Sequence, residues 1–584
     1  MYGNRYATDG GSIIRIKTVI RNDTRWTVLR LREDDSNTHL EWLNAVDTAN
    51  SDDGEWETLL PSLTTGKIPL IEVYNSYISG TTPTDTNQTI ISNGEENFSV
   101  WNMAFGTVAS NDATTLTLNA VTGYADLTAL GFDATGTIIV DGTEYAYTGL
   151  STLTFTGLSG LPTFTANTGV AQAVFDSGTL RTVDVSTVAK IDTGIVADGR
   201  LWGARSDASC NLVASKAGEA IDFSVGSGNP GDGLLKAFVE GQSPTLALAS
   251  KDEKIFILGR NHISFYELQY PDSTSRVEVS KTFRQGPDIG IASKLALAKV
   301  ENDIWFTTAR GQIKSIFKVD QDNFDMLDVA EDIRPTVENF DFSKCSNIYF
   351  PNKRIFLSAC RSSSDMTFND KVIVVYKTKD ENKNIVQSID IKDWHFNDFT
   401  VTPDGDLIGA SSVSSNVFKL FDGWSIDGAP YQSLRTFKRL NYGLYFNEKE
   451  QSYIPIVGGL VPGTTLHFDF DYDSGGSRGH IEATLVYTDT DYLTEPAYNT
   501  IGSLEIGAEP IGGPLEGIAD YQPFIMFFSL PREYSFFDLQ LTIWSDGTGQ
   551  RWYVDAVGLP SSTGSEDAIS VVEELNSKYY KSIL

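Results

Sequence analysis

Residues that usually build metal or nucleophilic sites are scarce in this chain of 584 residues, which has three Cys and five His. Cys210, Cys345 and Cys360 supply neither a disulfide framework nor a metal-binding pair, so we expect buried free thiols in a reducing compartment. None of the histidines has metal-ligand spacing or belongs to a recognisable Ser/His/Asp set. These histidines are His39, His262, His395, His467 and His480.

Long apolar runs are also missing. No stretch reaches the roughly 18 apolar residues of a membrane-spanning helix, so we expect no membrane span. The opening residues Met1–Arg5 lack the apolar core of a secretory signal. The sequence therefore predicts neither an anchor nor a secretory leader.

Basic residues are few relative to acidic ones. The chain has 45 Lys and Arg against 77 Asp and Glu, a formal net charge of −32. A surface that holds nucleic acid tightly needs Lys and Arg for the phosphates, so this balance argues against such a surface. It does not argue against a pore through which DNA slides without adhering.

The residues that are abundant point to an all-β protein. Hydrophobic residues make up 41% of the chain and charged ones 21%, which is typical of a folded protein. The 50 Gly, the many β-branched residues and the recurrent Asp-Gly pairs favour strands joined by tight turns. The length suggests three or four domains.

One pattern recurs five times between residues 198 and 423. A polar turn-like pair or triplet leads into a short apolar run anchored at Leu201, Ile255, Ile304, Ile355 and Leu407, in steps of 54, 49, 51 and 52 residues. A second apolar run follows each anchor, as in a hairpin. A steady period of about 50 residues is typical of propeller blades. We predict a β-propeller, and the alternative is a β-sandwich with accidental spacing.

The pattern extends towards the N-terminus if an insertion is allowed. Trp26 and Leu70 stand in similar hairpin-like segments, but Leu70 and Leu201 are 131 residues apart. Removing one period of about 51 residues leaves about 80 residues for an insertion. Counting these two segments gives seven blades. Terminal blades are often built from both chain ends, so we predict six or seven.

Five segments follow from these changes of pattern. Residues 1–104 are the first part of the propeller. Residues 105–173, which contain no Lys or Arg, form a small inserted β domain with an Asp-Gly hairpin. Residues 174–434 complete the propeller. Residues 435–560 contain segments in which apolar and polar residues alternate, and these predict a C-terminal β-sandwich. Residues 561–584 predict a linker and a short amphipathic C-terminal helix.

A glycine-rich segment, Gly226–Gly231, matches the dinucleotide-binding fingerprint letter for letter. That site needs a helix N-terminus to receive the pyrophosphate. Pro230 and Gly233 stand where the helix would begin, and the flanks are strand-like. We therefore interpret this segment as a propeller loop.

Three alternating aspartates, Asp469, Asp471 and Asp473, resemble the start of a calcium loop. The EF-hand pattern needs Gly at its sixth position and Glu at its twelfth, where this chain has Ser474 and His480. A strand with its acidic face in water explains the alternation better.

No motif selects two of the 77 carboxylates as a glycosidase pair. We therefore predict that the protein is not an enzyme. The sequence gives no candidate catalytic, cofactor-binding or metal-binding residues.

Several segments share an arrangement of a strand, a Gly-rich loop and a following strand, or of a short β module. These segments are Asp198–Gly203, Ala220–Phe223, Leu246–Ser250, Lys254–Arg260, Gly286–Ile291, Asn302–Phe306 and Asp141–Gly149. Through them the chain resembles the tail-hub (nozzle) proteins of tailed bacteriophages, and residues 141–149 resemble small β modules that recur in phage tail structural proteins. The resemblance covers roughly residues 10 to 560, mostly as a pattern of strands and loops.

The resemblance implies a structural virion protein, made in the host cytoplasm and placed in the tail. Such subunits form a homo-oligomeric ring, usually a hexamer, that docks to an adaptor or tail ring, with tail fibres as further partners. The ring would retain the genome and then pass it without specific binding, helped by an acidic channel lining. The alternative is a carbohydrate-binding or glycoside-hydrolysing β-propeller.

Overall fold

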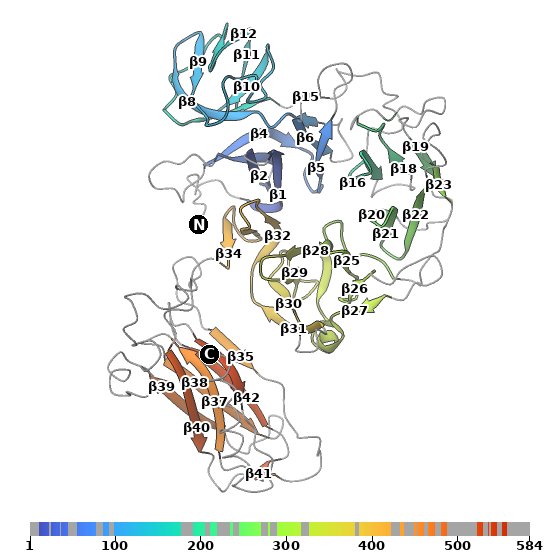
Figure 1. The fold of residues 1–584 in the computed structure, drawn as a ribbon, viewed down its shortest axis with the longest axis vertical. Helices are drawn as coiled ribbons and strands as arrows, with labels where there is room; N and C mark the ends of the chain where they lie inside the picture. The colour runs from blue at the N-terminus through green and yellow to red at the C-terminus, as the bar shows by residue number, and fades with distance from the viewer. Residues whose placement is uncertain are drawn as a thin grey trace, which may run out of the picture. The chain divides into compact units, whose positions relative to one another are not determined.

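The computed structural model is almost entirely antiparallel β-sheet and divides into two compact units, Met1–Leu420 and Phe421–Leu584 (Figure 1). Among the described residues, helical structure is limited to η2 (Glu331–Ile333) and α2 (Arg334–Val337). The all-β prediction is confirmed. The structure describes residues 11–22, 25–34, 37–44, 55–76, 86–92, 99–173, 175–176, 191–204, 211–218, 223, 234–237, 244–269, 278–280, 289–316, 326–379, 385–421, 433–436, 449–450, 453–460, 465–472, 480–486, 522–529, 535–536, 539–545 and 552–557.

Seven sheets of three or four strands follow one another in the described part of the first unit, and we call them the recurring sheets. Each begins with the strand that comes first in the chain. In order, the first four are β1 (Ser12–Asn22), β2 (Arg25–Glu33), β3 (Thr38–Asn44), β4 (Glu55–Leu63); β5 (Leu70–Ser76), β6 (Thr86–Ser92), β7 (Ser99–Trp101), β15 (Phe175–Asp176); β16 (Thr193–Ala197), β17 (Arg200–Ala204), β18 (Asn211–Ala214), β19 (Leu234–Ala237); and β20 (Thr245–Lys251), β21 (Lys254–Gly259), β22 (Ile263–Gln269), β23 (Glu278–Ser280). The last three are β24 (Leu297–Val300), β25 (Asp303–Thr307), β26 (Ile313–Ser315), β27 (Leu327–Asp328); β28 (Asp341–Phe350), β29 (Ile355–Arg361), β30 (Lys371–Lys379), β31 (Ile385–Lys392); and β32 (Phe396–Val401), β33 (Leu407–Ser411), β34 (Val417–Leu420).

The repeated turn-plus-apolar pattern marks the second strand of five recurring sheets. Its anchors lie in β17, β21, β25, β29 and β33, and each anchor is at most 3% exposed. The turns before them hold residues at positive φ, for example Asp198 at 54°, Glu301 at 55° and Gly405 at 87°. Asp and Gly tolerate this conformation better than bulky residues do, which explains the Asp-Gly pairs before Leu201 and Leu407. The predicted hairpins at these five places are confirmed.

Leu70 occupies a different place from the other anchors. It opens β5, the first strand of its sheet, and the buried pair Ile90 and Ile91 lies in the second strand, β6. The turn signal at Gly66 lies in the connection from β4 to β5, and Gly66 has a φ of 73°. A turn before an apolar strand has the same local signature wherever it falls. The sequence pattern therefore placed the anchor of this sheet on its first strand, whereas the other five anchors lie on second strands.

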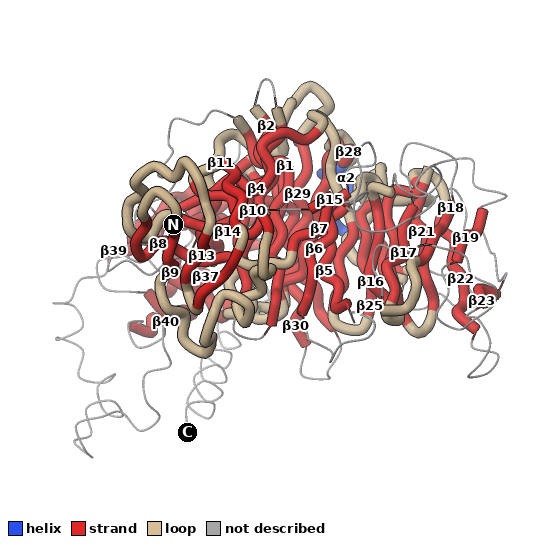
Figure 2. Tube along the Cα trace, turned by 90° about the horizontal axis from the view of Figure 1, so that it is seen from above, coloured by secondary structure: helices blue, strands red, loops and turns tan. Residues whose placement is uncertain are grey.

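Neighbouring recurring sheets touch mostly through their first strands; the exception is β20, which contacts the second strand of the next sheet. β1 contacts β5, β5 contacts β16, β16 contacts β20, β20 contacts β25, β24 contacts β28, β28 contacts β32, and β32 contacts β1. Figure 1 shows these sheets following one another around a common centre. In Figure 2, β5, β6, β7 and β16 extend along a common direction. The series of contacts therefore returns to its starting sheet.

The contact between the first and last recurring sheets, which we call the seam, uses side-chain hydrogen bonds. Ile16 N–H donates to Asp398 Oδ2 at 2.9 Å, and Thr18 N–H donates to Thr400 Oγ1 at 2.8 Å. Asn397 Nδ2 donates to the Ile13 carbonyl at 2.8 Å. An apolar cluster shared by the two sheets lies behind these bonds. The seam thus joins residues almost 400 positions apart without a backbone ladder.

The predicted insertion lies between β7 and β15. Its strands pair with one another in a seven-stranded sheet and enclose an apolar cluster of their own. In spatial order these strands are β11 (Thr143–Tyr147), β10 (Gly136–Val140), β14 (Gly169–Gln172), β8 (Phe105–Asn111), β9 (Thr115–Leu118), β13 (Thr154–Thr156) and β12 (Gly149–Ser151). The chain then returns to the second recurring sheet, where Phe175 pairs with Val100. The predicted hairpin turn at Asp141 and Gly142 is present, with both residues at positive φ.

The second unit begins at Phe421, earlier than the expected residue 435. Its strand β35 pairs with β42 more than a hundred residues later. The segment 561–584, where we predict a helix, lies outside the described residues. The sheets of this unit, in spatial order, are β35 (Ser433–Thr436), β42 (Leu539–Ser545), β38 (Thr465–Tyr472), β39 (His480–Val486); β36 (Lys449–Glu450), β41 (Ser535–Phe536); and β40 (Gln522–Ser529), β37 (Tyr453–Leu460), β43 (Trp552–Val557).

Candidate functional site

A cavity of about 560 Å³ lies among the first strands of the recurring sheets. Its volume is in the range of small-molecule sites. All seven first strands contribute to its wall, which is why no single stretch of sequence reveals it. One lining residue from each strand, in chain order, is Lys17, Glu72, Thr193, Leu248, Leu297, Asn347 and Asp398.

Seven charged side chains line this cavity, and we call them the cavity cluster. Four are cations and three are carboxylates, which leaves one excess positive charge in a chain whose formal charge is −32. They are Arg15, Lys17, Lys294, Lys299, Glu72, Asp192 and Asp398. The charge of this lining is therefore opposite in sign to the net charge of the chain.

Strand alternation and a register shift explain how β1 contributes two cations. Arg15 and Lys17 flank the buried Ile16, and successive side chains of a strand point to opposite faces. A register shift between Ile13 and Arg15 lets Ile13 share the face of Ile16. Ile13 and Ile16 pack into the apolar cluster at the seam. Arg15 and Lys17 remain partly exposed beside the cavity.

Two of the cations form ion pairs with carboxylates that line the same cavity. Lys294 forms an ion pair with the buried Asp192, and its ammonium group also lies 3.4 Å from the Ile68 carbonyl. Burial lowers the pKa of Lys294, the nearby Arg15 lowers it further, and Asp192 opposes both effects. Lys17 Nζ lies 3.4 Å from Glu72 Oε1.

Asp398 is a buried carboxylate of the cavity cluster and accepts hydrogen bonds from two other strands. It is 5% exposed and accepts hydrogen bonds from Ile16 N–H at the seam and from the Ser346 hydroxyl. Burial raises the pKa of Asp398, although these hydrogen bonds and the Arg15 charge partly offset the increase. Asp398 therefore links the cavity wall to the seam.

Arg15 differs from its neighbours because its guanidinium group forms no hydrogen bond or ion pair within the described part of the chain. Burial lowers the pKa of Arg15, while the charges of Asp398 and Glu72 act in the opposite direction. Lys299, which is exposed, also has no ion pair to a described residue. The cavity thus contains cations whose donors are free for another group.

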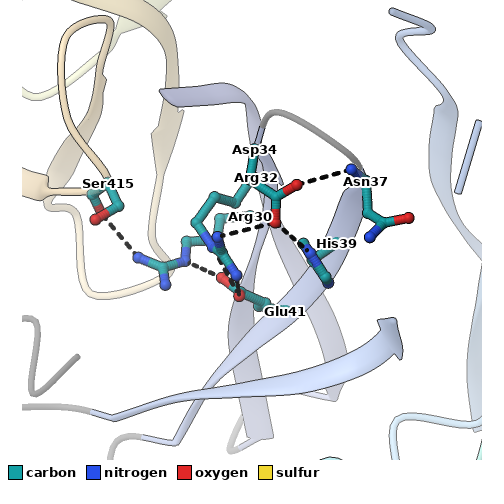
Figure 3. Close-up of polar contacts among 7 residues, drawn as sticks. All are labelled: Arg30, Arg32, Asp34, Asn37, His39, Glu41 and Ser415. Carbon is teal, nitrogen blue, oxygen red and sulfur yellow. Dashed lines mark hydrogen bonds and ion pairs between the residues drawn. The ribbon is translucent and has the colours of Figure 1, made fainter. Parts of the chain in front are cut away.

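A second polar group, which we call the seam cluster, joins Arg30, Arg32 and Glu41 of the first recurring sheet to Ser415 of the last (Figure 3). Arg30 is 1% exposed, donates from Nε to Glu41 Oε2, and donates from Nη1 to the Ser415 carbonyl at 2.8 Å. Arg32 occupies the other Glu41 oxygen at 3.0 Å. Ser415 precedes β34, so this cluster also ties the first sheet to the last.

The seam cluster extends outward to the turn between β2 and β3. Asp34 Oδ1 accepts a hydrogen bond from Asn37 N–H at 2.7 Å, and Asp34 Oδ2 lies 2.9 Å from His39 Nε2 (Figure 3). Arg32 lies 3.9 Å from the same Oδ2 atom. The role of His39 is therefore to form a hydrogen bond with the carboxylate of Asp34 in this turn.

The inserted domain is attached to the first recurring sheet by arginine contacts. The Arg25 guanidinium lies 4.2 Å from the Phe105 ring centre and donates to the Phe105 carbonyl. Arg21 Nη2 donates to the Ala129 carbonyl at 3.3 Å, and Gly169 N–H donates to Glu57 at 3.0 Å. Burial and the neighbouring Arg21 lower the pKa of Arg25 to about 10.

The cysteines that the structure describes follow the sequence prediction. Cys345 and Cys360 are buried and free. Burial raises the pKa of Cys345 to about 12, so its thiol stays protonated at neutral pH. Cys210 lies outside the described residues, as does the glycine-rich segment 226–231.

The aspartate series lies in strand β38 as far as the structure describes it. Asp469 accepts a hydrogen bond from Trp544 Nε1 at 3.0 Å, and Asp471 is part of the same strand. Asp473 lies outside the described residues. In the described ranges, no group of three or more His, Cys, Asp or Glu side chains is placed to hold a metal ion. Nor does any helix there have the length and apolar character for crossing a membrane.

Comparisons with known proteins give no family. No family model matches the chain, and no curated protein matches it. Among solved structures, the computationally designed Ika8 protein is similar over 70% of this chain and 96% of its own, with 11% identity and a TM-score of 0.30. Raptor from Chaetomium thermophilum is similar over 70% of this chain and 27% of its own, with 9% identity and a TM-score of 0.33. At these scores neither structure informs the function.

Proposed function

We propose that this protein is a structural subunit built on a seven-bladed β-propeller, of the kind found in the tail nozzle of a tailed bacteriophage. The observation that supports the architecture is the series of contacts between neighbouring sheets, mostly through first strands, that returns from β32 to β1. Each recurring sheet is then one blade. The phage assignment rests on the sequence resemblance described above, and on the modular addition of an inserted β domain and a second β unit.

The subunits would assemble into a homo-hexameric ring that docks to an adaptor or tail ring, with tail fibres as further partners. The DNA path would lie between subunits, because a cavity of about 560 Å³ has the volume of a small-molecule site and not of a duplex. A net charge of −32 on each chain favours passage without adhesion, since like charges repel the phosphates. No enzymatic step is required of this chain.

A carbohydrate-binding or glycoside-hydrolysing propeller is less well supported. Sugar sites combine aromatic side chains with free carboxylates. The lining residues described for the cavity include the aromatic Tyr349 and Phe399 but no Trp. Asp192 is paired with Lys294, and Asp398 is held by Ile16 and Ser346. The carboxylates near the cavity are therefore occupied by structural contacts.

The decisive experiment measures the assembly state of the purified full chain by mass photometry, alone and with a portal–adaptor complex. We expect a particle of about six times the 64.1 kDa subunit, formed alone or on that complex. A monomer that does not bind the portal–adaptor complex would contradict the proposal. A monomer that also binds glycans on an array would favour the carbohydrate-binding alternative.

A further inference from the structure

We infer that the central cavity binds a small molecule bearing a phosphate or carboxylate group, with Arg15 as its principal anchor. The site is formed by first strands from all seven recurring sheets, and its volume of about 560 Å³ suits a small organic anion. This inference goes beyond the structural role proposed above. It holds whether the chain acts alone or in a ring.

The unused donors of Arg15 are the first support. A guanidinium carries five N–H donors and, in this protein, none of them reaches a described acceptor. The two carboxylates that attract it are already engaged, Asp398 by Ile16 and Ser346, and Glu72 by Lys17. The planar fork of arginine matches the two oxygens of a carboxylate or phosphate.

The grouping of like charges is the second support. Arg15 and Lys294 lie close enough for the charge of one to disfavour the charge of the other, and Lys299 lines the same cavity. Cations held together in a partly buried space repel one another more strongly than they would in water. A bound anion would relieve this repulsion and supply acceptors for the unused donors.

The remaining features favour a small ligand over a polymer. The cavity has an excess of one positive charge, but the chain around it carries −32, which disfavours the approach of a nucleic acid. A compact anion with one or two charged groups suits both the excess positive charge of the cavity lining and the cavity volume. Because the ligand would touch strands on both sides of the seam, its binding should stabilise the folded state.

The test is isothermal titration calorimetry of the full chain with inorganic phosphate and with citrate, against sodium chloride at equal ionic strength. We expect saturable binding of at least one of the two anions, with a matching rise in the thermal midpoint. Arg15→Gln should weaken this binding by at least about tenfold, because charge-assisted hydrogen bonds are lost. Arg260→Gln, which removes the same charge from an exposed position outside the cavity, is the control and should bind as the wild type does.

A charge reversal at Lys299 keeps the test decisive if Arg15→Gln does not fold. Lys299 is exposed and has no ion pair to a described residue, so Lys299→Glu should retain the wild-type thermal midpoint without ligand. We expect it to weaken anion binding by about tenfold, through repulsion in the cavity. Absence of saturable binding in the wild type would overturn the inference. So would wild-type affinity in a folded Arg15→Gln protein or in Lys299→Glu.

Discussion

The cavity cluster and the seam cluster use the same residue types to opposite effect. In the seam cluster, Glu41 receives both Arg30 and Arg32, and Arg30 also reaches the Ser415 carbonyl. In the cavity cluster, Arg15 is surrounded by carboxylates that are already engaged. A buried charge with saturated partners holds the fold together, whereas one with free donors is available to a ligand. The number of satisfied donors, more than the charge itself, separates a structural arginine from a binding one.

The largest effect is expected at the centre of the seam cluster. Glu41→Gln removes the charge shared by two buried arginines, and breaking a buried ion pair costs about 3 to 5 kcal/mol. Chemical denaturation of the full chain measures this loss in the first unit. Glu338→Gln, at an exposed position, is the control and should change stability by less than about 0.5 kcal/mol. A loss below about 1 kcal/mol for Glu41→Gln would show that the seam cluster is not structural.

Matched arginine substitutions compare the two clusters directly. Arg30→Gln loses charged hydrogen bonds to Glu41 and Ser415, and we expect a loss of about 2 to 4 kcal/mol. Arg15→Gln loses no hydrogen bond to a described residue, and we expect a change of less than about 1 kcal/mol. Both are measured by the same denaturation assay without added anion. Equal losses would remove the distinction between the clusters.

Asp398, which belongs to the cavity but hydrogen-bonds across the seam, should make stability depend on pH. Burial raises its pKa above the ordinary value of 3.8, so between that value and the higher folded pKa the native state binds more protons than the unfolded state. Its contribution to the free energy of unfolding therefore falls as pH rises through this window.

The comparison with Asp398→Asn isolates this contribution. The wild type should lose stability relative to the variant as the pH rises above about 4, by about 1.4 kcal/mol for each unit by which the pKa is raised. Urea denaturation at a series of pH values measures the difference. A constant difference from pH 3 to pH 8, on the order of experimental error, would contradict the prediction.

The smallest effect is expected at Lys17 and Glu72, the partly exposed pair of the cavity cluster. Their side chains are 35% and 22% exposed and 3.4 Å apart, so solvent screens the interaction. A double-mutant cycle with Lys17→Gln and Glu72→Gln should give a coupling energy of at most about 1 kcal/mol. A larger coupling energy would show that this pair stabilises the fold as the buried ion pairs of the seam cluster do.

Local signals predicted the recurring sheets well. The turns that need positive φ and the buried strands that follow them are encoded within a few residues, as at Asp198 and Leu201. The shift at Leu70 has the same origin, because a turn before a first strand cannot be told from a turn before a second strand. The abrupt change of composition over residues 105–173 coincides with the part of the chain that holds β8 to β14.

The candidate site could not be predicted in this way. The cavity joins residues from Arg15 to Val401, and no sequence spacing reports contacts of that range. Arg30, Arg32 and Glu41 alternate along strands as an exposed polar face would, yet all three are buried. A useful signal would have been an alignment of the seven first strands, because Arg15, Lys17 and Lys299 all lie on such strands and line the cavity.

The seam has a consequence for synthesis on the ribosome. Ile16 and Asp398 are separated by 382 residues, so β1 cannot reach its partner until almost the whole first unit has been made. At translation rates of about 5 to 20 residues per second, the N-terminal sheet waits roughly 20 to 80 seconds with one side uncovered. During that interval nascent chains on one polysome expose identical, unmatched faces to each other. Slow elongation before residue 398 would lengthen this exposure, and a chaperone that shields the first sheet would raise the yield of the closed form.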